Sequence, residues 1–585
     1  MKFFMKKSLI LLNLFFIQAF SLDINITAKD FINSPTTYIS AQCYTKTTDE
    51  KNPKIISNPC YSCHTQNKEP NFTYEDYKLQ ESYDFPAAAR RNPFKNLFID
   101  RSEKIAKISD DEILSYIRKD NYKDENGEII LEKKLKNLDP KWDYNKNGIW
   151  DGYIPDCEYN FDEDGFDVGK DGEMTGWRAF SYYPFLGTFW PTNGSTDDTL
   201  IRLPKIFQFD ENGKIDREIY KLNLLIVESL IKQKSLKIDP VDESKFGVDL
   251  NQNGKFDVAD EIKFKWEKPK LDTKSGKLSG FSMSYVGLAK NLQIKNKVQI
   301  APGLYPLGTE FLHSVRYIDI NGEKITPSKR MKELRYGVKK YWQSYGELLD
   351  TGAKAIKEKH DFPDRIEKFI GNVETGLNNN RGWFFQGFIE DKKGDLRPQN
   401  YEESVFCMGC HSNIGALTDS TFVFARKFEK GAYKNGWYHG SKRGFEGIKD
   451  FILPNGKGEY ALYLYLNNAG DEFRSNDEIM QKFFVSNWRE NKDMIKKEYE
   501  LNQKGGNNIF VTESLKFKNK AINILKNDIS YLIMPSPKRA MRLNKTYKTI
   551  VDEQSFVFGR DGGVFENVHK SVKEGQKTGI KAVKF

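Results

Sequence analysis

Two short motifs place cysteine and histidine at a spacing that suits covalent cofactor chemistry. Each is a Cys-x-x-Cys-His run, in a chain that has only six cysteines and six histidines. The residues are Cys60, Cys63 and His64 in the first motif and Cys407, Cys410 and His411 in the second. Two thiols three residues apart can each add to one vinyl group of a single haem, and the adjacent histidine then binds the iron. The pattern predicts two covalently bound haem c groups.

Three other interpretations use the same cysteines. A four-cysteine zinc site would use both pairs but leaves the two trailing histidines unexplained. A thioredoxin-like redox pair needs a strand before it, whereas the turn-like run 57–59 precedes Cys60. Two disulfides, each spanning three residues, would be strained. Haem is therefore favoured, and the remaining Cys43 and Cys157 leave both a disulfide and two reduced thiols open.

The first 21 residues have the composition of a secretory leader. Lysines stand at its start, an apolar run from Leu9 to Phe20 follows, and small residues precede Leu22. No cysteine comes directly after the apolar run, so no lipid anchor is expected there. No later stretch approaches 18 uninterrupted apolar residues. The sequence predicts an exported, periplasmic protein with no integral membrane span after cleavage.

With these ten motif residues and its leader, the chain resembles the two-haem members of the c-type cytochrome family. The resemblance implies electron transfer between periplasmic redox partner proteins. A peroxidase-like oxidoreductase of the same class, with one open iron site for a small substrate, is the alternative. The chain's 585 residues favour more than a bare carrier, because one haem domain needs only about a hundred.

The sixth iron ligand separates these two functions, and three residues are candidates for it. His313 lies in an alternating run before the turn-forming pair Asn321-Gly322, which predicts a strand. His439 lies in an aromatic, glycine-containing loop. Met534 precedes Pro535, which is similar to the ligand segment of small class I cytochromes c.

Runs of aspartate and asparagine between the two motifs suggest calcium loops. The best match to the loop template consists of Asp249, Asn251, Asn253, Lys255 (through its backbone carbonyl), Asp257 and Asp260. A second run holds Asp143, Asn145, Asn147 and Asp151, and a third holds Asp162 and Asp164. Solvated turns are the alternative, because these residue types favour them in any case. The expected cofactors are therefore two haem c groups and Ca²⁺.

Composition and length set the expected organisation. The net charge of +9 is spread over 91 basic and 82 acidic residues, which is too weak and scattered for nucleic-acid binding. The expected fold class is multi-domain α+β, with mainly helical haem c regions at both ends and a loop- and strand-rich calcium-loop region in the middle. One helix is predicted around Ser328–Lys359. The expected divisions are a signal peptide at 1–21, an N-terminal haem c region at 22–135, a calcium-loop region at 136–265, a strand- and hairpin-containing domain at 266–395 and a C-terminal haem c domain at 396–585.

Overall fold

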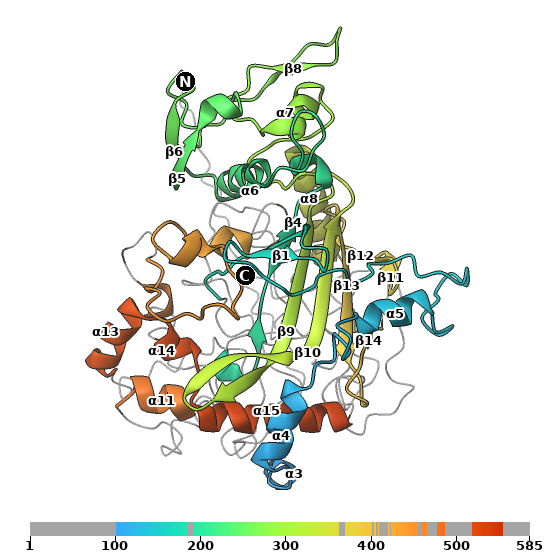
Figure 1. The fold of residues 1–585 in the computed structure, drawn as a ribbon, viewed down its shortest axis with the longest axis vertical. Helices are drawn as coiled ribbons and strands as arrows, with labels where there is room; N and C mark the ends of the chain where they lie inside the picture. Colours follow the sequence, from blue (N-terminus) through green and yellow to red (C-terminus); the bar gives the residue numbers. More distant parts are fainter. Residues whose placement is uncertain are drawn as a thin grey trace, which may run out of the picture.

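A ten-stranded antiparallel sheet organises the protein (Figure 1). The structure is a computed structural model, and it describes residues 101–184, 191–361, 369–400, 403–404, 408, 419, 421, 423–452, 456, 458–461, 464, 477–485 and 517–553. The strand order is β1-β2-β4-β9-β10-β13-β12-β11, with β14 beside β13 and β3 beside β9. The strands are β1 (Phe166–Val168), β2 (Met174–Ala179), β3 (Thr196–Asp197), β4 (Leu200–Arg202), β9 (Glu310–Asn321), β10 (Lys324–Lys339), β11 (Gly371–Asn372), β12 (Gly376–Asn378), β13 (Trp383–Glu390) and β14 (Leu396–Pro398).

The long β9–β10 hairpin forms the centre of this sheet. The predicted strand through His313 is confirmed, and the chain reverses at Gly322, whose φ of 61° suits the left-handed turn. The predicted helix around Ser328–Lys359 is wrong over its first part, because β10 runs to Lys339. Lys332 and Glu333 are fully buried in that strand, so their charges did not mark a solvated helix.

Helices cover the sheet and fill the space beside it. They are α3 (Ser102–Ile105), α4 (Asp110–Arg118), α5 (Ile130–Lys136), α6 (Arg217–Lys232), α7 (Gly287–Ile294), α8 (Tyr345–Asp361), α11 (Asp477–Phe483), α13 (Asn519–Asn527), α14 (Ser530–Ile533) and α15 (Pro537–Glu553). α4 and α15 pack together on β9 and β10, although about 430 residues separate them in the chain (Figure 1). Tyr317 and Ile389 of the sheet contribute to the apolar cluster between them.

The local sequence explains where α6 begins and ends, and this helix borders a cavity described below. Asp216 accepts hydrogen bonds from the backbone N–H groups of Glu218 and Ile219, which caps the first turn. The helix ends at Gln233, which has a left-handed φ of 50°. Its apolar side chains join the largest core cluster, and burying each full Leu or Ile side chain contributes about 1.5–3 kcal/mol.

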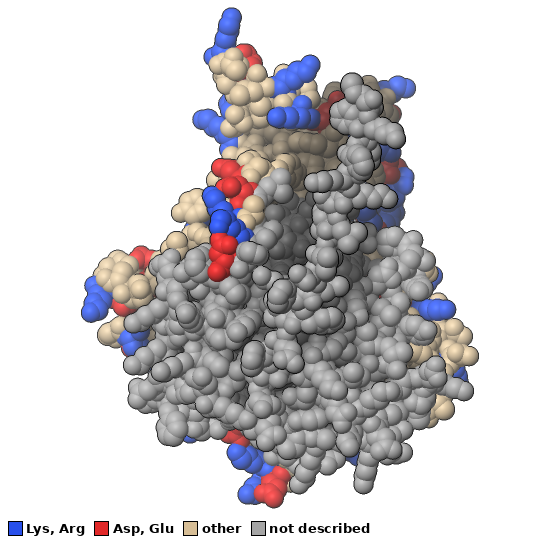
Figure 2. Space-filling view, turned by 180° about the vertical axis from the view of Figure 1, so that it is seen from behind, with Lys and Arg blue, Asp and Glu red and all other residues tan. Residues whose placement is uncertain are grey.

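Two small sheets complete the described part of the chain. They are β5 (Leu236–Asp242) with β6 (Val258–Ile262), and β7 (Lys270–Leu271) with β8 (Leu278–Ser279). β7 and β8 lie at one end of the molecule, where Lys and Arg side chains gather on the face shown in Figure 2. None of the described helices is long and apolar enough to cross a membrane.

The expected fold class is wrong. Instead of mainly helical regions at both ends of a loop-rich middle, one large antiparallel sheet dominates the described residues, with helices packed onto it from the C-terminal part. Strands from residues 166–202 and 310–398 belong to this single sheet. The division of the chain into the regions given above stays a prediction.

Candidate functional site

A cavity of about 470 Å³ lies beside the β9–β10 hairpin and is lined by polar and aromatic side chains. Three parts of the chain form most of its wall: residues 180–182 with 191 and 196–198, the start of β10 at 324–327, and residues 433 and 439–446. Met534 completes it from the end of α14. A cavity of this size with a few converging polar groups is the usual form of a small-molecule site.

Asp198 is a buried carboxylate in the wall of this cavity. It directly follows β3, which pairs with β9, and it is 8% exposed. Its carboxylate accepts hydrogen bonds from the backbone N–H and the hydroxyl of Ser314, at 2.6 and 2.5 Å. Burial raises its pKa, but the hydrogen bonds from His439 and Ser314 and the charge of Arg316 outweigh burial and lower the pKa to about 2. Asp198 is therefore a fixed, ionised carboxylate.

His439 connects Asp198 to the cavity mouth. Its Nε2 lies 3.0 Å from Asp198 Oδ2, and its Nδ1 lies 2.7 Å from Ser441 Oγ. An ionised carboxylate can only accept, so Nε2 carries the hydrogen and Nδ1 presents its lone pair. The backbone N–H of Ser441 also donates to Nδ1, at 3.1 Å. Ser441, His439 and Asp198 thus form one hydrogen-bonded chain that runs from an exposed hydroxyl to a buried carboxylate.

Aromatic side chains hold the imidazole in place. The Phe161 ring stacks on His439 with centroids 4.3 Å apart and planes 13° apart. Tyr159 meets the same ring edge-on and also contacts the Arg316 guanidinium, 4.7 Å from the Tyr159 ring centroid. Arg316 in turn donates to Ser314 Oγ, so the contacts around Asp198 support one another.

The neighbouring Asp197 has the opposite electrostatic character. Its side chain is 5% exposed, accepts a hydrogen bond from Tyr182 and lies 3.8 Å from His313 Nδ1. Burial, with a smaller contribution from Asp198, raises its pKa to about 7. Burial and the charge of Arg335 lower the pKa of His313 to about 4. Two adjacent aspartates whose pKa values are shifted in opposite directions are typical of a site where protons are transferred.

The structure brings all three candidate iron ligands to this region. His439 and Met534 line the cavity, and His313 lies directly behind it, with Nδ1 against the Asp198 carbonyl. Both ring nitrogens of His439 are already hydrogen-bonded. The six motif residues, Cys60, Cys63, His64, Cys407, Cys410 and His411, lie outside the described residues, as does Cys43. Haem attachment and the iron-ligand roles stay predictions, while Cys157 is a buried free thiol.

Asp197, Asp198 and Ser441 could not be predicted as site residues from the sequence. Asp198 and His439 are 241 residues apart, and only the pairing of β3 with β9 brings them together. The one usable signal was His439 itself, as a rare histidine in an aromatic loop.

The two best calcium-loop candidates adopt the same local structure. In one, Asp249 accepts from the backbone N–H groups of Asn253 and Gly254, at 3.1 and 2.8 Å. In the other, Asp143 accepts from those of Asn147 and Gly148, at the same two distances. The Asn amides then donate to Asp257 and Asp151, respectively.

A buried glutamate supports each of these loops. Glu243 accepts backbone N–H groups of the Asp249 loop, and Glu374 accepts those of Tyr144 and Asp151. The third candidate pair, Asp162 and Asp164, is held by the guanidinium of Arg217. No group of three or more His, Cys, Asp or Glu side chains that could share a metal ion occurs among the described residues. A general assignment as a metal-binding protein is therefore corrected, and occupancy of the individual loops stays a prediction.

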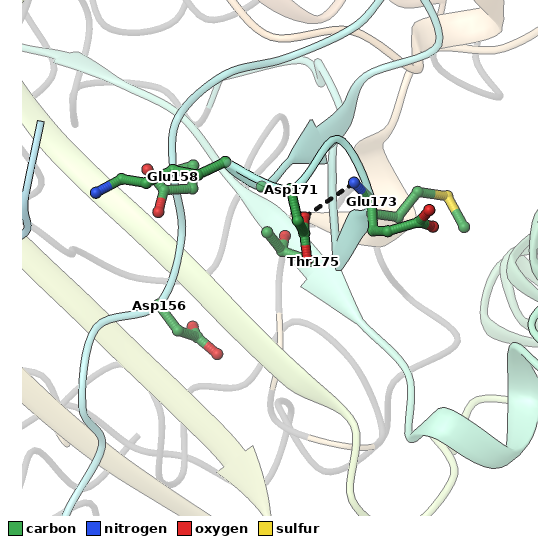
Figure 3. Close-up of a pocket in the computed structure, with 8 residues that line it drawn as sticks. Asp156, Glu158, Asp171, Glu173 and Thr175 are labelled. Atoms are coloured by element: carbon green, nitrogen blue, oxygen red, sulfur yellow. Dashed lines mark hydrogen bonds between the residues drawn. The ribbon is translucent and has the colours of Figure 1, made fainter.

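An acidic cavity of about 350 Å³ follows the second loop. Its labelled carboxylates, Asp156, Glu158, Asp171 and Glu173, point apart rather than toward one centre (Figure 3). Asp156 pairs with Arg202 at 2.6 Å, Glu158 pairs with Lys123, and Asp171 accepts from the Glu173 backbone at 3.0 Å. These contacts give Asp156, Glu158 and Asp171 structural partners.

The large sheet and the helices packed on it describe a mixed α and β protein with a polar cavity beside the β9–β10 hairpin. A family model described as a “-like lipoprotein” matches residues 26–584. An “Uncharacterized lipoprotein” of Aquifex aeolicus (strain VF5) is 32% identical over 575 residues, which cover 91% of this chain and 86% of that protein. The chain belongs to this lipoprotein family. No solved structure matches the chain.

Family membership corrects the identification as a two-haem c-type cytochrome. That resemblance rested on ten motif residues, whereas the lipoprotein match extends over nearly the whole chain. The electron-transfer function and the peroxidase-like alternative followed from the resemblance and are corrected with it. Membership in a lipoprotein family supports an exported protein, in agreement with the leader.

Proposed function

We propose that the protein is an exported hydrolase of the cell envelope, active on the periplasmic side, with Ser441 as nucleophile, His439 as base and Asp198 as the group that orients the base. The observation that carries the proposal is the continuous chain Ser441 Oγ–His439–Asp198 at 2.7 and 3.0 Å, opening into the cavity of about 470 Å³. A nucleophile beside a base, with the base held by a third group, is the arrangement that activates a hydroxyl.

The hydrogen-bond roles define the proton path. Ser441 Oγ attacks a carbonyl carbon while its proton moves to His439 Nδ1. Asp198 accepts the hydrogen bond from His439 Nε2–H throughout. Because it is ionised and buried, it also stabilises the positive charge of the imidazolium that forms. His439 then returns the proton to the leaving group, and water repeats the sequence to free Ser441. Here the serine contacts Nδ1 and the aspartate contacts Nε2, which leaves the roles unchanged because either nitrogen can act as the base.

The cavity wall supports a polar acyl substrate. Phe180, Tyr182 and Phe445 offer apolar surface, and Lys324, Lys442 and Arg443 supply positive charge. Such a wall suits an ester or amide that carries an anionic or hydroxyl-bearing group.

Labelling with a fluorophosphonate tests the proposal without knowledge of the substrate. Attack by Ser441 Oγ on phosphorus displaces fluoride and adds a stable mass that peptide mapping locates. We expect labelling at Ser441 in the full chain, none in Ser441→Ala, and a rate about 10²–10⁴-fold lower in His439→Gln. Ser181→Ala is the matched control, because Ser181 lines the same cavity but donates to the Tyr438 carbonyl instead of to a histidine. Labelling of Ser181, or equal labelling of Ser441→Ala and the unaltered protein, would overturn the proposal.

A further inference from the structure

A second cavity, of about 480 Å³, lies between α6, β5 and the segment 427–437. The chain around Trp437 and His439 borders both cavities, with Trp437 lining this one and His439 lining the other. Basic side chains are prominent in its wall, and two buried N–H donors in it have no hydrogen-bond acceptor among the described residues.

Arg178 is the first of these groups. Its guanidinium lies between two aromatic rings, 4.5 Å from the Phe166 centroid and 4.0 Å from the Trp437 centroid. Nε donates to the Asp164 carbonyl at 3.0 Å, while Nη1 is buried and has no hydrogen-bond acceptor in the described part of the protein. Arg178 is 5% exposed, and burial lowers its pKa to about 10. A buried cation normally has an anion beside it, because an unpaired one is costly.

The nearby carboxylates are engaged by other cations. Asp164 pairs with Arg217 at 3.1 Å and Lys221 at 2.9 Å. Glu228 pairs with Lys232 at 2.8 Å and Lys427 at 3.0 Å. Seven Lys and Arg side chains and five carboxylates line the cavity, so its wall carries an excess of positive charge.

Trp437 supplies the second unpartnered group. Its indole Nε1 is buried and has no acceptor among the described residues, and the side chain is 3% exposed. At the exposed edge of the same cavity lie Lys430, which donates to the Ile238 carbonyl, and Lys434, whose ammonium is 3.9 Å from Asp164. Two buried N–H donors and two exposed ammonium groups therefore line the same cavity.

We propose that this cavity binds an oxyanion, the phosphate or carboxylate group of a small molecule, between Arg178 Nη1 and Trp437 Nε1. Lys430 and Lys434 attract the anion to the entrance. An oxyanion accepts from both buried donors and neutralises the guanidinium, which supplies the acceptor that the described residues do not provide there. The Phe166 and Trp437 rings hold the planar guanidinium in position for this contact.

Thermal unfolding of the full chain with inorganic phosphate, against chloride at equal ionic strength, tests this site. We expect phosphate to raise Tm with concentration beyond the effect of chloride. Arg178→Gln should weaken the apparent affinity by about tenfold or more, since a hydrogen bond to a charged group is lost. Lys295→Gln, at the exposed end of α7, is the control and should respond as the unaltered protein does.

Trp437→Phe and Lys434→Gln provide independent variants if Arg178→Gln fails to fold. Trp437→Phe removes one N–H donor and keeps a ring against Arg178, so it should also weaken the phosphate response, and Lys434→Gln should weaken it less. Phosphate and chloride acting alike, or an unchanged phosphate response in Arg178→Gln and Trp437→Phe, would overturn the proposal. Ser441→Ala should keep the phosphate response, so failure of this site and failure of the hydrolase are distinguishable.

Discussion

Two acidic regions of this protein use the same residue type in opposite ways. The loops around Asp143 and Asp249 are largely exposed, and their carboxylates accept hydrogen bonds from their own backbone. Asp197 and Asp198 are buried at the edge of the sheet, and their partners come from distant parts of the chain. In the buried pair, burial raises the pKa of Asp197 to about 7, whereas hydrogen bonds and the charge of Arg316 outweigh burial and lower that of Asp198 to about 2.

The comparison shows that an aspartate's chemistry is set by its access to water and by its partners. Asp197 and Asp198 are consecutive, yet one remains protonated near neutral pH and the other is ionised in all but strong acid. The difference arises because Asp198 accepts hydrogen bonds from His439 and Ser314 and forms an ion pair with Arg316. Asp197 accepts a hydrogen bond from the neutral hydroxyl of Tyr182.

The largest effect is expected from removing the Asp198 carboxylate. Asp198→Ala leaves the N–H and hydroxyl of Ser314 and the Nε2 hydrogen of His439 without their acceptor, in a buried place. We expect a loss of about 3–5 kcal/mol in the free energy of unfolding, measured by urea denaturation. Asp198→Asn keeps the shape and should lose less. If Asp198→Ala lost less than about 1 kcal/mol, the buried contacts of Asp198 would contribute no more to the free energy of unfolding than those of an exposed loop.

Because of Asp197, we expect the free energy of unfolding to fall as the pH rises. Its folded pKa of about 7 lies above the ordinary 3.8, so between these values the unfolded chain releases the proton while the folded protein keeps it. Asp197→Asn removes the titration and should be more stable than the unaltered protein above pH 7, by on the order of 3 kcal/mol. Urea denaturation from pH 4 to 8 measures both slopes. Parallel pH profiles for the two proteins would contradict the raised pKa.

His313 should act in the opposite direction. Its folded pKa of about 4 lies below the ordinary 6.5, so stability is lost as pH falls between these values, because the unfolded chain takes up a proton that the folded protein does not. His313→Gln should flatten the acid side of the profile by on the order of 2 kcal/mol. Histidine NMR titration of the folded protein provides the direct check, and a value near 6.5 for His313 would disprove its burial as a neutral ring.

Local patterns were readable from the sequence, and long-range ones were not. The β9 strand follows from alternation before Asn321-Gly322, since both signals lie within a dozen residues. Most of β10 lies within the helix predicted around Ser328–Lys359, and its charged residues give no local sign that they are buried in a strand. In the structure, Arg330 pairs with Glu390 at 2.7 Å across the sheet, which makes burial of both charges tolerable.

The candidate site depended even more on the fold. Ser441 and His439 are close in sequence, but a Ser-x-His or His-x-Ser spacing is too common to carry information. The acid that gives the pair its chemistry comes from β3, a strand of two residues whose position is set by β9. The Asp249 and Asp143 loops, by contrast, are stabilised by hydrogen bonds between residues four or five positions apart, so their turns could be recognised from the residue types alone.

The smallest effect is expected in those loops. Asp249→Ala removes two hydrogen bonds at the surface, where water can replace the lost acceptor of Asn253 and Gly254. We expect a loss of about 1 kcal/mol in the free energy of unfolding, and a similar loss for Asp143→Ala, since the two loops share their geometry. Repeating the urea denaturation with added Ca²⁺ tests the sequence prediction for these loops, because an ion bound by Asp249 would stabilise the unaltered protein and leave Asp249→Ala unaffected. A loss as large as that of Asp198→Ala would mean that exposure does not separate the two acidic regions.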